Sequence, residues 1–143
     1  MNQQFLTELK AVTAENRIFT DEPMKNHVPY QVIGNGSNLL VGDRGIRGLV
    51  IEMLSKEDEI CVEDDCITVG AGMLLSKTAN RAAEHGLTGM EFAAGIPGSI
   101  GGAVVMNAGA YGGEMKDILT AVTVLDQEGN EKIFSAEELE LGY

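Results

Sequence analysis

The segment VIGNGSNLLVG, residues 32–42, contains the residue types that bind an anion. Gly34 and Gly36 permit a close approach of the backbone, and successive amides in such a turn form a concave anion-binding nest. Ser37 and Asn38 add side-chain donors. The same composition also forms a tight turn between two strands without any ligand. These residues by themselves therefore leave both interpretations open.

Two common phosphate-binding motifs do not describe this loop. The dinucleotide fingerprint requires G-x-G-x-x-G at the start of a helix, whereas Leu39 occupies the place of the third glycine. A Walker loop is excluded because no Gly-Lys-Ser/Thr follows. Residues 39–41 are apolar and favour a strand. We therefore expect a strand-to-strand loop that presents its amides.

A second glycine-rich segment, AAGIPGSIGGAVVMNAGAYGG, spans residues 93–113 and carries no charged side chain. A packed core disfavours so many glycines because each loses much conformational entropy on folding. The composition instead favours backbone lying against a large flat ligand, and a structural linker is the alternative. Residues 103–106 are expected to form an apolar wall, and Asn107 to hydrogen-bond a ring edge. Phosphate contacts are expected from the amides of Gly98, Ser99 and Gly101.

No catalytic constellation accompanies these loops. His27 and His85 are isolated, the latter near a predicted helix end, and residues 57–59 form an acidic run expected in solvent. No spacing of cysteine, histidine and carboxylate indicates a metal site. Any chemistry is therefore expected to belong to a bound cofactor.

Length and charge narrow the class of protein. A chain of 143 residues fits one domain with a modest core. The 22 acidic and 10 basic residues give a net charge of −12. Nucleic-acid binding requires basic clusters, and the sequence contains none. The acidic balance is expected to serve solubility.

Two further features bear on the compartment. Cys61 and Cys66 are expected to be reduced thiols, and no signal peptide precedes them, so the predicted location is the cytoplasm. Residues 92–113 are uncharged over about the length of a membrane span. Their seven glycines and one proline argue against a spanning helix.

The pattern of hydrophobic residues predicts the elements that position the two loops. Helices are expected over residues 2–11, 74–85 (ending at Gly86) and 137–141, the last opened by a capping box of Ser135 and Glu138. Strands are expected over 30–33 and 48–51, in a hairpin over 59–70, and in a pair formed by 121–126 and 131–134. Because strands and helices do not alternate regularly, the fold class is α+β rather than doubly wound.

The strings GNGSNLLV and GIPGSIGGAVVMNAGAYGGEM resemble the FAD-binding domain of the bacterial UDP-N-acetylenolpyruvoylglucosamine reductase (MurB) family. The resemblance runs from about Pro29 to Tyr143. It implies a vanillyl-alcohol-oxidase (PCMH-type) FAD-binding fold, present here in incomplete form. It also implies an NADPH-dependent flavoprotein oxidoreductase that makes UDP-N-acetylmuramate from a UDP-sugar substrate in the cytoplasm. Peptidoglycan synthesis, cell wall biogenesis, cell shape and cell division depend on that reaction.

The resemblance assigns cofactor-binding roles to three groups of residues. The pyrophosphate loop consists of Gly34, Asn35, Gly36, Ser37, Asn38 and Leu39. The small-residue turn consists of Gly70, Ala71 and Gly72. The long loop along FAD contributes Ala94, Gly95, Ile96, Pro97, Gly98, Ser99, Gly101, Gly102, Ala103, Asn107 and Gly109. Tyr111 and Glu114 match a turn with a structural role, and Tyr143 a substrate-side position.

The chain also departs from the family pattern. Val28 leads directly into PYQVIGNGSN, so part of the N-terminal subdomain is expected to be missing after about residue 28 of a domain spanning 1–143. The C-terminal substrate domain, with its proton-donating serine, is absent from this sequence. We therefore expect no assignable catalytic residue, weak FAD binding and no turnover. The alternatives are a non-catalytic binding or interaction module, with homo-oligomers formed through exposed edges, and another flavin oxidoreductase of the superfamily.

Overall fold

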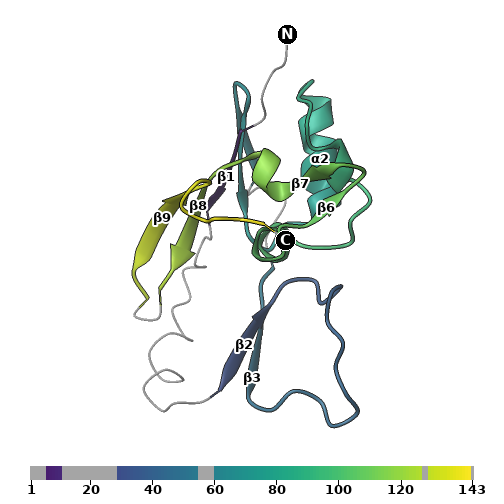
Figure 1. Ribbon diagram of the computed structural model, residues 1–143, viewed down its shortest axis with the longest axis vertical. Helices are drawn as coiled ribbons and strands as arrows, with labels where there is room; N and C mark the ends of the chain where they lie inside the picture. Colours follow the sequence, from purple (N-terminus) through teal and green to yellow (C-terminus); the bar gives the residue numbers. More distant parts are fainter. Residues whose placement is uncertain (1–5, 11–28, 55–59, 127–128, 143) are drawn as a thin grey trace.

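The computed structural model describes residues 6–10, 29–54, 60–126 and 129–142. Two units are visible in Figure 1: a five-stranded sheet with helices, and a separate pair of strands below it. The order in the larger sheet is β4-β5-β1-β8-β9, and the pair consists of β2 and β3. The described elements are therefore mixed α and β.

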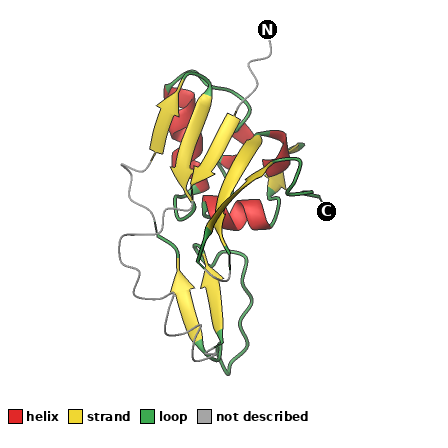
Figure 2. Cartoon of the chain, turned by 90° about the vertical axis from the view of Figure 1, so that its left-hand side faces the viewer, coloured by secondary structure: helices red, strands yellow, loops and turns green. Residues whose placement is uncertain are grey.

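The five-stranded sheet combines two hairpins around a central strand. Strands β4 (Ile60–Glu63) and β5 (Cys66–Gly70) are antiparallel, as are β8 (Leu119–Leu125) and β9 (Glu131–Ser135). Strand β1 (Leu6–Lys10) lies between β5 and β8 and is parallel to both. The sheet faces the viewer in Figure 2.

The helices cover one face of this sheet, behind it in Figure 2. They are α2 (Leu75–Glu84), the short α3 (Ile100–Val105), and the 3₁₀ turns η3 (Glu91–Ala93) and η4 (Met115–Asp117). Apolar side chains from β5, the helices and β8 form one core, whose fully buried members include Ile67, Leu75, Ile100 and Met115. This core fixes the glycine-rich segment against the sheet.

The smaller pair is built from β2 (Tyr30–Ile33) and β3 (Leu49–Glu52). They are parallel, with Tyr30 beside Leu49 and Val32 beside Ile51. Gly48 has φ +108°, and a β-carbon there would lie 2.2 Å from the carbonyl oxygen of Pro29. Only glycine therefore allows β3 to start against β2.

Most of the predicted elements are confirmed. The structure has strands at β2 and β3, the β4–β5 hairpin with Asp64 in its turn, helix α2 and the β8–β9 pair. Gly86 follows α2 with φ +71°, the left-handed conformation expected of a helix stop.

Three element predictions are wrong. Within the predicted helix over 2–11, residues 6–10 form strand β1, because pairing on both sides outweighs a short helical pattern. Residues 39–41 form no strand. Residues 137–140 form turns and Leu141 no regular element, so the predicted helix is absent; Glu140 has φ +46°, which is incompatible with continued α-helix.

The predicted capping box nevertheless forms at this turn. Ser135 N and Oγ both donate to Glu138 Oε2 at 2.9 Å, and Glu138 N donates to Ser135 Oγ at 3.3 Å. The hydrogen bonds from the Ser135 backbone and side chain lower the pKa of Glu138. The local hydrogen bonds expected of a helix start therefore exist without the helix.

The cysteines lie diagonally across the β4–β5 hairpin. Cys61 is paired with Thr68, and Cys66 with Glu63. Diagonal neighbours are about 7–8 Å apart between α-carbons, beyond the usual range for a disulfide. Neither cysteine forms a disulfide in the structure, and their reduced state stays a prediction. In the part of the chain that the structure describes, no helix is long and apolar enough to cross a bilayer.

Helix α3 offers a matched test of the core. Val104 is 7% exposed and packs in the core, whereas Val105 is 82% exposed. We expect Val104→Ala to lower the free energy of unfolding by about 1.5–3 kcal/mol through lost burial. Val105→Ala should change it by less than about 0.5 kcal/mol. Urea unfolding of both variants measures this, and equal losses would show that α3 does not pack as described.

Candidate functional site formed by three glycine-containing loops

Two of the predicted loops are joined by backbone hydrogen bonds. Leu75 N donates to the Gly98 carbonyl at 2.9 Å, Ile100 N to Met73 at 2.8 Å, and Gly101 N to Ala71 at 2.7 Å. A β-carbon on Gly101 would lie 2.9 Å from that of Ala71, so glycine is needed for this approach. Residues 70–75 and 98–101 thus form one rigid frame between β5 and α3.

The loop at residues 34–38, which we call the opening loop, meets this frame most closely at Gly34. An ideal β-carbon on Gly34 would lie 1.9 Å from Ser99 Oγ. Ser99 is buried, and its Oγ accepts a hydrogen bond from Gly102 N at 3.3 Å as the N-cap of α3. Ser37 Oγ also lies 3.6 Å from the position of a β-carbon on Gly98. Residues 34–38 and 98–102 are therefore adjacent.

The outer part of the opening loop presents backbone amides. Leu39 N donates to the Gly36 carbonyl at 3.2 Å, and Gly36 has φ +67°. Residues 35–38 are exposed. Among the described residues, no carbonyl group or side chain accepts a hydrogen bond from the backbone amides of residues 35–38. Four successive exposed amides suit a bound anion.

The charges around the loops are balanced, unlike those of the whole chain. Residues 29–54 contain two acidic and two basic side chains, namely Asp43, Glu52, Arg44 and Arg47. Residues 92–113 contain no charged side chain. An anionic ligand at the loops therefore meets no local excess of carboxylates, although the chain carries −12.

Asn107 anchors the end of the glycine-rich segment. It is 2% exposed and has φ +43°, a conformation that asparagine tolerates better than most residues. Its Nδ2 donates to Glu114 Oε2 at 2.6 Å, and its Oδ1 accepts from Lys116 N at 3.0 Å. The Lys116 ammonium is 2.5 Å from Glu114 Oε1, and this carboxylate raises the pKa of Lys116. Both ends of the Asn107 amide are thus engaged within the protein.

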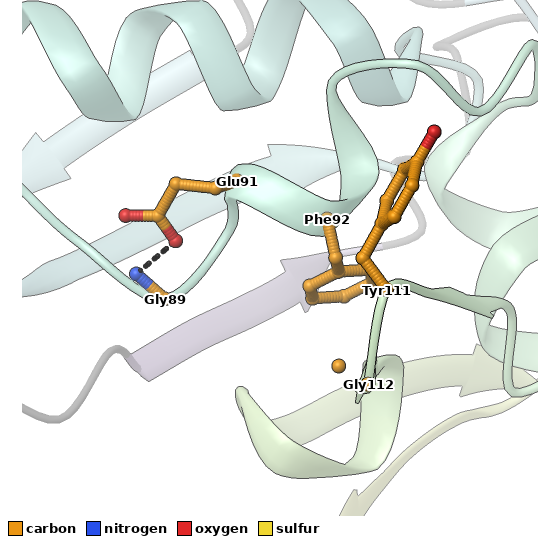
Figure 3. Close-up of a pocket in the computed structure, with 6 residues that line it drawn as sticks. Gly89, Glu91, Phe92, Tyr111 and Gly112 are labelled. Atoms are coloured by element: carbon orange, nitrogen blue, oxygen red, sulfur yellow. Dashed lines mark hydrogen bonds between the residues drawn. The ribbon is translucent and has the colours of Figure 1, made fainter.

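A short hairpin follows Asn107. Strands β6 (Gly109–Ala110) and β7 (Gly113–Glu114) are antiparallel. A β-carbon on Gly113 would lie 2.8 Å from the Phe92 ring. An open pocket of about 440 Å³ lies beside this hairpin, and Figure 3 shows the exposed Tyr111 above the buried Phe92. Its lining includes Gly89, Glu91 and Gly112, and none of the predicted cofactor-binding residues.

The structure brings together part of the predicted site. The loops meeting at Ser99 contribute Gly34, Ser37, Ala71, Gly98, Ser99, Gly101 and Gly102. Gly95 is exposed, with open space where a β-carbon would lie. By contrast Ala103 is buried in the core, and Gly109 faces Glu114 in the hairpin. Tyr143 and His27 lie outside the described residues.

Sequence reasoning missed two features of this site. It placed no helix in residues 93–113, although α3 forms there with its own cap. It also missed the hydrogen bonds of Asn107 with Glu114 and Lys116, because separations of seven and nine residues across a hairpin carry no local signal. The predicted apolar wall at 103–106 is divided, with Val104 in the core and Val105 in solvent.

Fold and loops together define an α+β domain that presents glycine-rich backbone to an anionic ligand. The family model described as "FAD binding domain" matches residues 19–135, and the chain belongs to this family. The predicted fold class is thereby confirmed.

The chain is similar to several proteins that carry the same enzyme name. The chain is 57% identical over 118 residues to UDP-N-acetylenolpyruvoylglucosamine reductase of Clostridium tetani, covering 82% of this chain and 38% of the relative. It is 40% identical over 177 residues to the Clostridium botulinum (strain Hall) protein of the same name. This match covers 100% of this chain and 58% of the relative. The crystal structure of the Thermus caldophilus enzyme matches with a TM-score of 0.69 and 40% identity, over 96% of this chain and 48% of that one. The chain thus spans less than two thirds of each relative's length, and the predicted resemblance is confirmed.

Replacing Asn107 tests its buried contacts. In Asn107→Asp a carboxylate oxygen takes the place of Nδ2, 2.6 Å from Glu114 Oε2. Two carboxylates this close raise the folded-state pKa of the pair above the unfolded values, so stability is lost as the pH rises through that range. We expect a loss of about 2–4 kcal/mol at pH 7 that shrinks below about pH 5. Urea unfolding over a pH series measures it.

Asn80→Asp is the matched control, since Asn80 is exposed on α2. Its unfolding free energy should change by less than about 0.5 kcal/mol at either pH. A pH-independent loss in Asn107→Asp would contradict the contact with Glu114.

Proposed function

We propose that these 143 residues are the FAD-binding portion of a UDP-N-acetylenolpyruvoylglucosamine reductase. In this proposal NADPH is the co-substrate, and the UDP-sugar enolpyruvyl ether is reduced to UDP-N-acetylmuramate for peptidoglycan. The observation that carries it is the Gly34–Ser99 contact, which joins the two loops bearing the family strings into one site. The names of the relatives support the reaction assigned.

The residues present fit the phosphates of FAD. The exposed amides of residues 35–38 would hold the pyrophosphate, with Ser37 and Asn38 as further donors. Gly98, whose β-carbon position is 3.6 Å from Ser37 Oγ, would lie along the rest of the cofactor together with the uncharged residues 95–97. FAD, when bound, supplies hydride transfer, and this chain's own part is to bind and orient it. Asn107 would position the segment through Glu114 and Lys116 rather than reach the cofactor itself.

We further propose that these residues alone bind FAD without turnover. His85 is exposed at the end of α2, and its Nδ1 is 2.9 Å from the Arg81 carbonyl oxygen. We therefore assign it no acid–base role. In residues 29–54, 60–126 and 129–142, no three metal-ligating side chains cluster. The proposal also includes an internal shortening after about residue 28. The 177-residue alignment of 143 residues with the C. botulinum relative supports it.

The proposal places the protein in the cytoplasm. Cys61 is exposed and Cys66 half-buried on the same hairpin, and the register holds them apart as thiols. Thiols that remain unoxidised are typical of a reducing compartment.

A second candidate function is that of a non-catalytic interaction module assembling as a homo-oligomer. The exposed apolar side chains of the β2–β3 unit favour it, among them Val32 and the fully exposed Leu40. Large exposed apolar patches on soluble proteins often mark interaction sites.

Gly34→Ala tests the shared site. The added β-carbon would lie 1.9 Å from Ser99 Oγ, so loop 34–38 must move away from loop 98–102. We expect the FAD dissociation constant to rise at least about tenfold, measured by flavin fluorescence titration. Gly42→Ala is the control, because nothing lies within 4 Å of its β-carbon position and its φ is not in the left-handed region.

The double variant Gly34→Ala/Ser99→Ala should recover part of the affinity, because the closest atom is removed and Ser99 Cβ is 3.0 Å away. Equal FAD affinity in Gly34→Ala and wild type would contradict the site. Full occupancy by FAD together with NADPH-dependent reduction of the enolpyruvyl sugar would contradict the proposed inactivity.

A further inference from the structure

The Glu114 carboxylate has three partners at the end of the glycine-rich segment. Its Oε2 accepts a hydrogen bond from Asn107 Nδ2 at 2.6 Å, and its Oε1 lies 2.5 Å from the Lys116 ammonium. The side chain also accepts from the backbone amide of Asp117 in the capping box of η4. Only 24% of the Glu114 side chain is exposed, so water screens these charge-assisted contacts only in part. One carboxylate therefore joins the β6–β7 hairpin, η4 and the residue that follows α3.

Helix α3 depends on contacts outside itself, because it is short and contains two adjacent glycines. It has six residues, and Gly101 and Gly102 are two of them. Isolated helices shorter than about 12–15 residues are marginal in water. Glycine is also among the least favourable residues inside a helix. The position of α3 is therefore set by its packing in the core and by what fixes its two ends.

The two ends of α3 are fixed by different contacts. At its start, Ser99 is the N-cap and lies against Gly34. At its other end, Asn107 N donates to the Val104 carbonyl at 3.0 Å, and the Asn107 side chain donates to Glu114. The end that meets the opening loop and the end that meets Glu114 thus belong to one short helix.

We infer that Glu114 is a positioning residue for the proposed cofactor site: by fixing Asn107 at one end of α3, it keeps Ser99 in place against Gly34 at the other. Its effect on the cofactor is indirect and acts through α3. The inference deepens the proposed function, and its consequence for FAD rests on that proposal. Its consequence for the loop itself does not require FAD.

Amide hydrogen exchange in the FAD-free chain tests the coupling along α3. Gly101 N donates to the Ala71 carbonyl and Gly102 N to Ser99 Oγ, so these two amides report on the loop. Glu114→Ala should make them exchange about tenfold faster or more, as for the loss of one hydrogen bond to a charged group. Glu114→Gln keeps an oxygen acceptor and should have a smaller effect. It also keeps the test decisive if Glu114→Ala does not fold.

The matched control is Glu84→Ala, which removes a carboxylate paired with Arg81 in the last turn of α2. It should leave the exchange of Gly101 and Gly102 unchanged. The amide of Thr78, which donates to the Leu74 carbonyl, reports on general destabilisation. Unchanged exchange of the two glycine amides in the Glu114 variants, or an equal increase at Thr78, would overturn the inference.

Flavin fluorescence titration of the same variants measures the consequence for FAD. At a temperature at which circular dichroism shows every variant folded, the FAD dissociation constant should rise about tenfold in Glu114→Ala. It should rise less in Glu114→Gln and stay unchanged in Glu84→Ala. Faster exchange at the loop with unchanged FAD affinity would overturn the inference. A wild type that binds no FAD would instead contradict the proposed function, and hydrogen exchange alone would then decide whether Glu114 positions the loop.

Discussion

The approach of Gly34 to Ser99 is the constraint on which the candidate site depends. Ser99 cannot retreat, because it is buried, caps α3 and lies between two backbone hydrogen bonds to the β5–α2 loop. Gly34 directly follows β2, so this contact places the end of β2 against the N-cap of α3. A single missing β-carbon thus sets the relation between the two loops.

The rest of the glycine-rich segment is held by packing and polar contacts rather than by ligand. Asn107, Glu114 and Lys116 close the turn after α3, and Gly113 packs on the Phe92 ring. Several of its glycines therefore serve close approach within the protein, whereas Gly36 and Gly95 have open space around them. The density of glycine reflects both uses, and only the contacts distinguish them.

The parts of the fold that the sequence predicted are those with strong local signals. The β4–β5 hairpin, α2 with Gly86, and the β8–β9 pair each have a clear period and a turn residue. Strand β1 could not be predicted, since its strand conformation depends on neighbours some 60 and 110 residues away along the chain. The capping hydrogen bonds of Ser135 and Glu138 formed without a helix, because a cap fixes a start and not a continuation.

For the candidate site, the sequence indicated which loops lie together. It did not indicate which of their residues are exposed and which are buried in the core. The resemblance indicated residues 34–39, 70–72 and selected positions between 94 and 109 as one cofactor site. In the structure, the Gly34–Ser99 contact and backbone hydrogen bonds from residues 71–75 join these loops to residues 98–102. Ala103 and Val104 of α3 are buried in the core, so these two residues of the motif do not reach the surface. In the proposed function, FAD binding depends chiefly on the amides of residues 35–38 and the backbone near Gly95. The proposal thus separates the residues that would contact an anion from those, such as Asn107, whose hydrogen bonds hold the backbone in place.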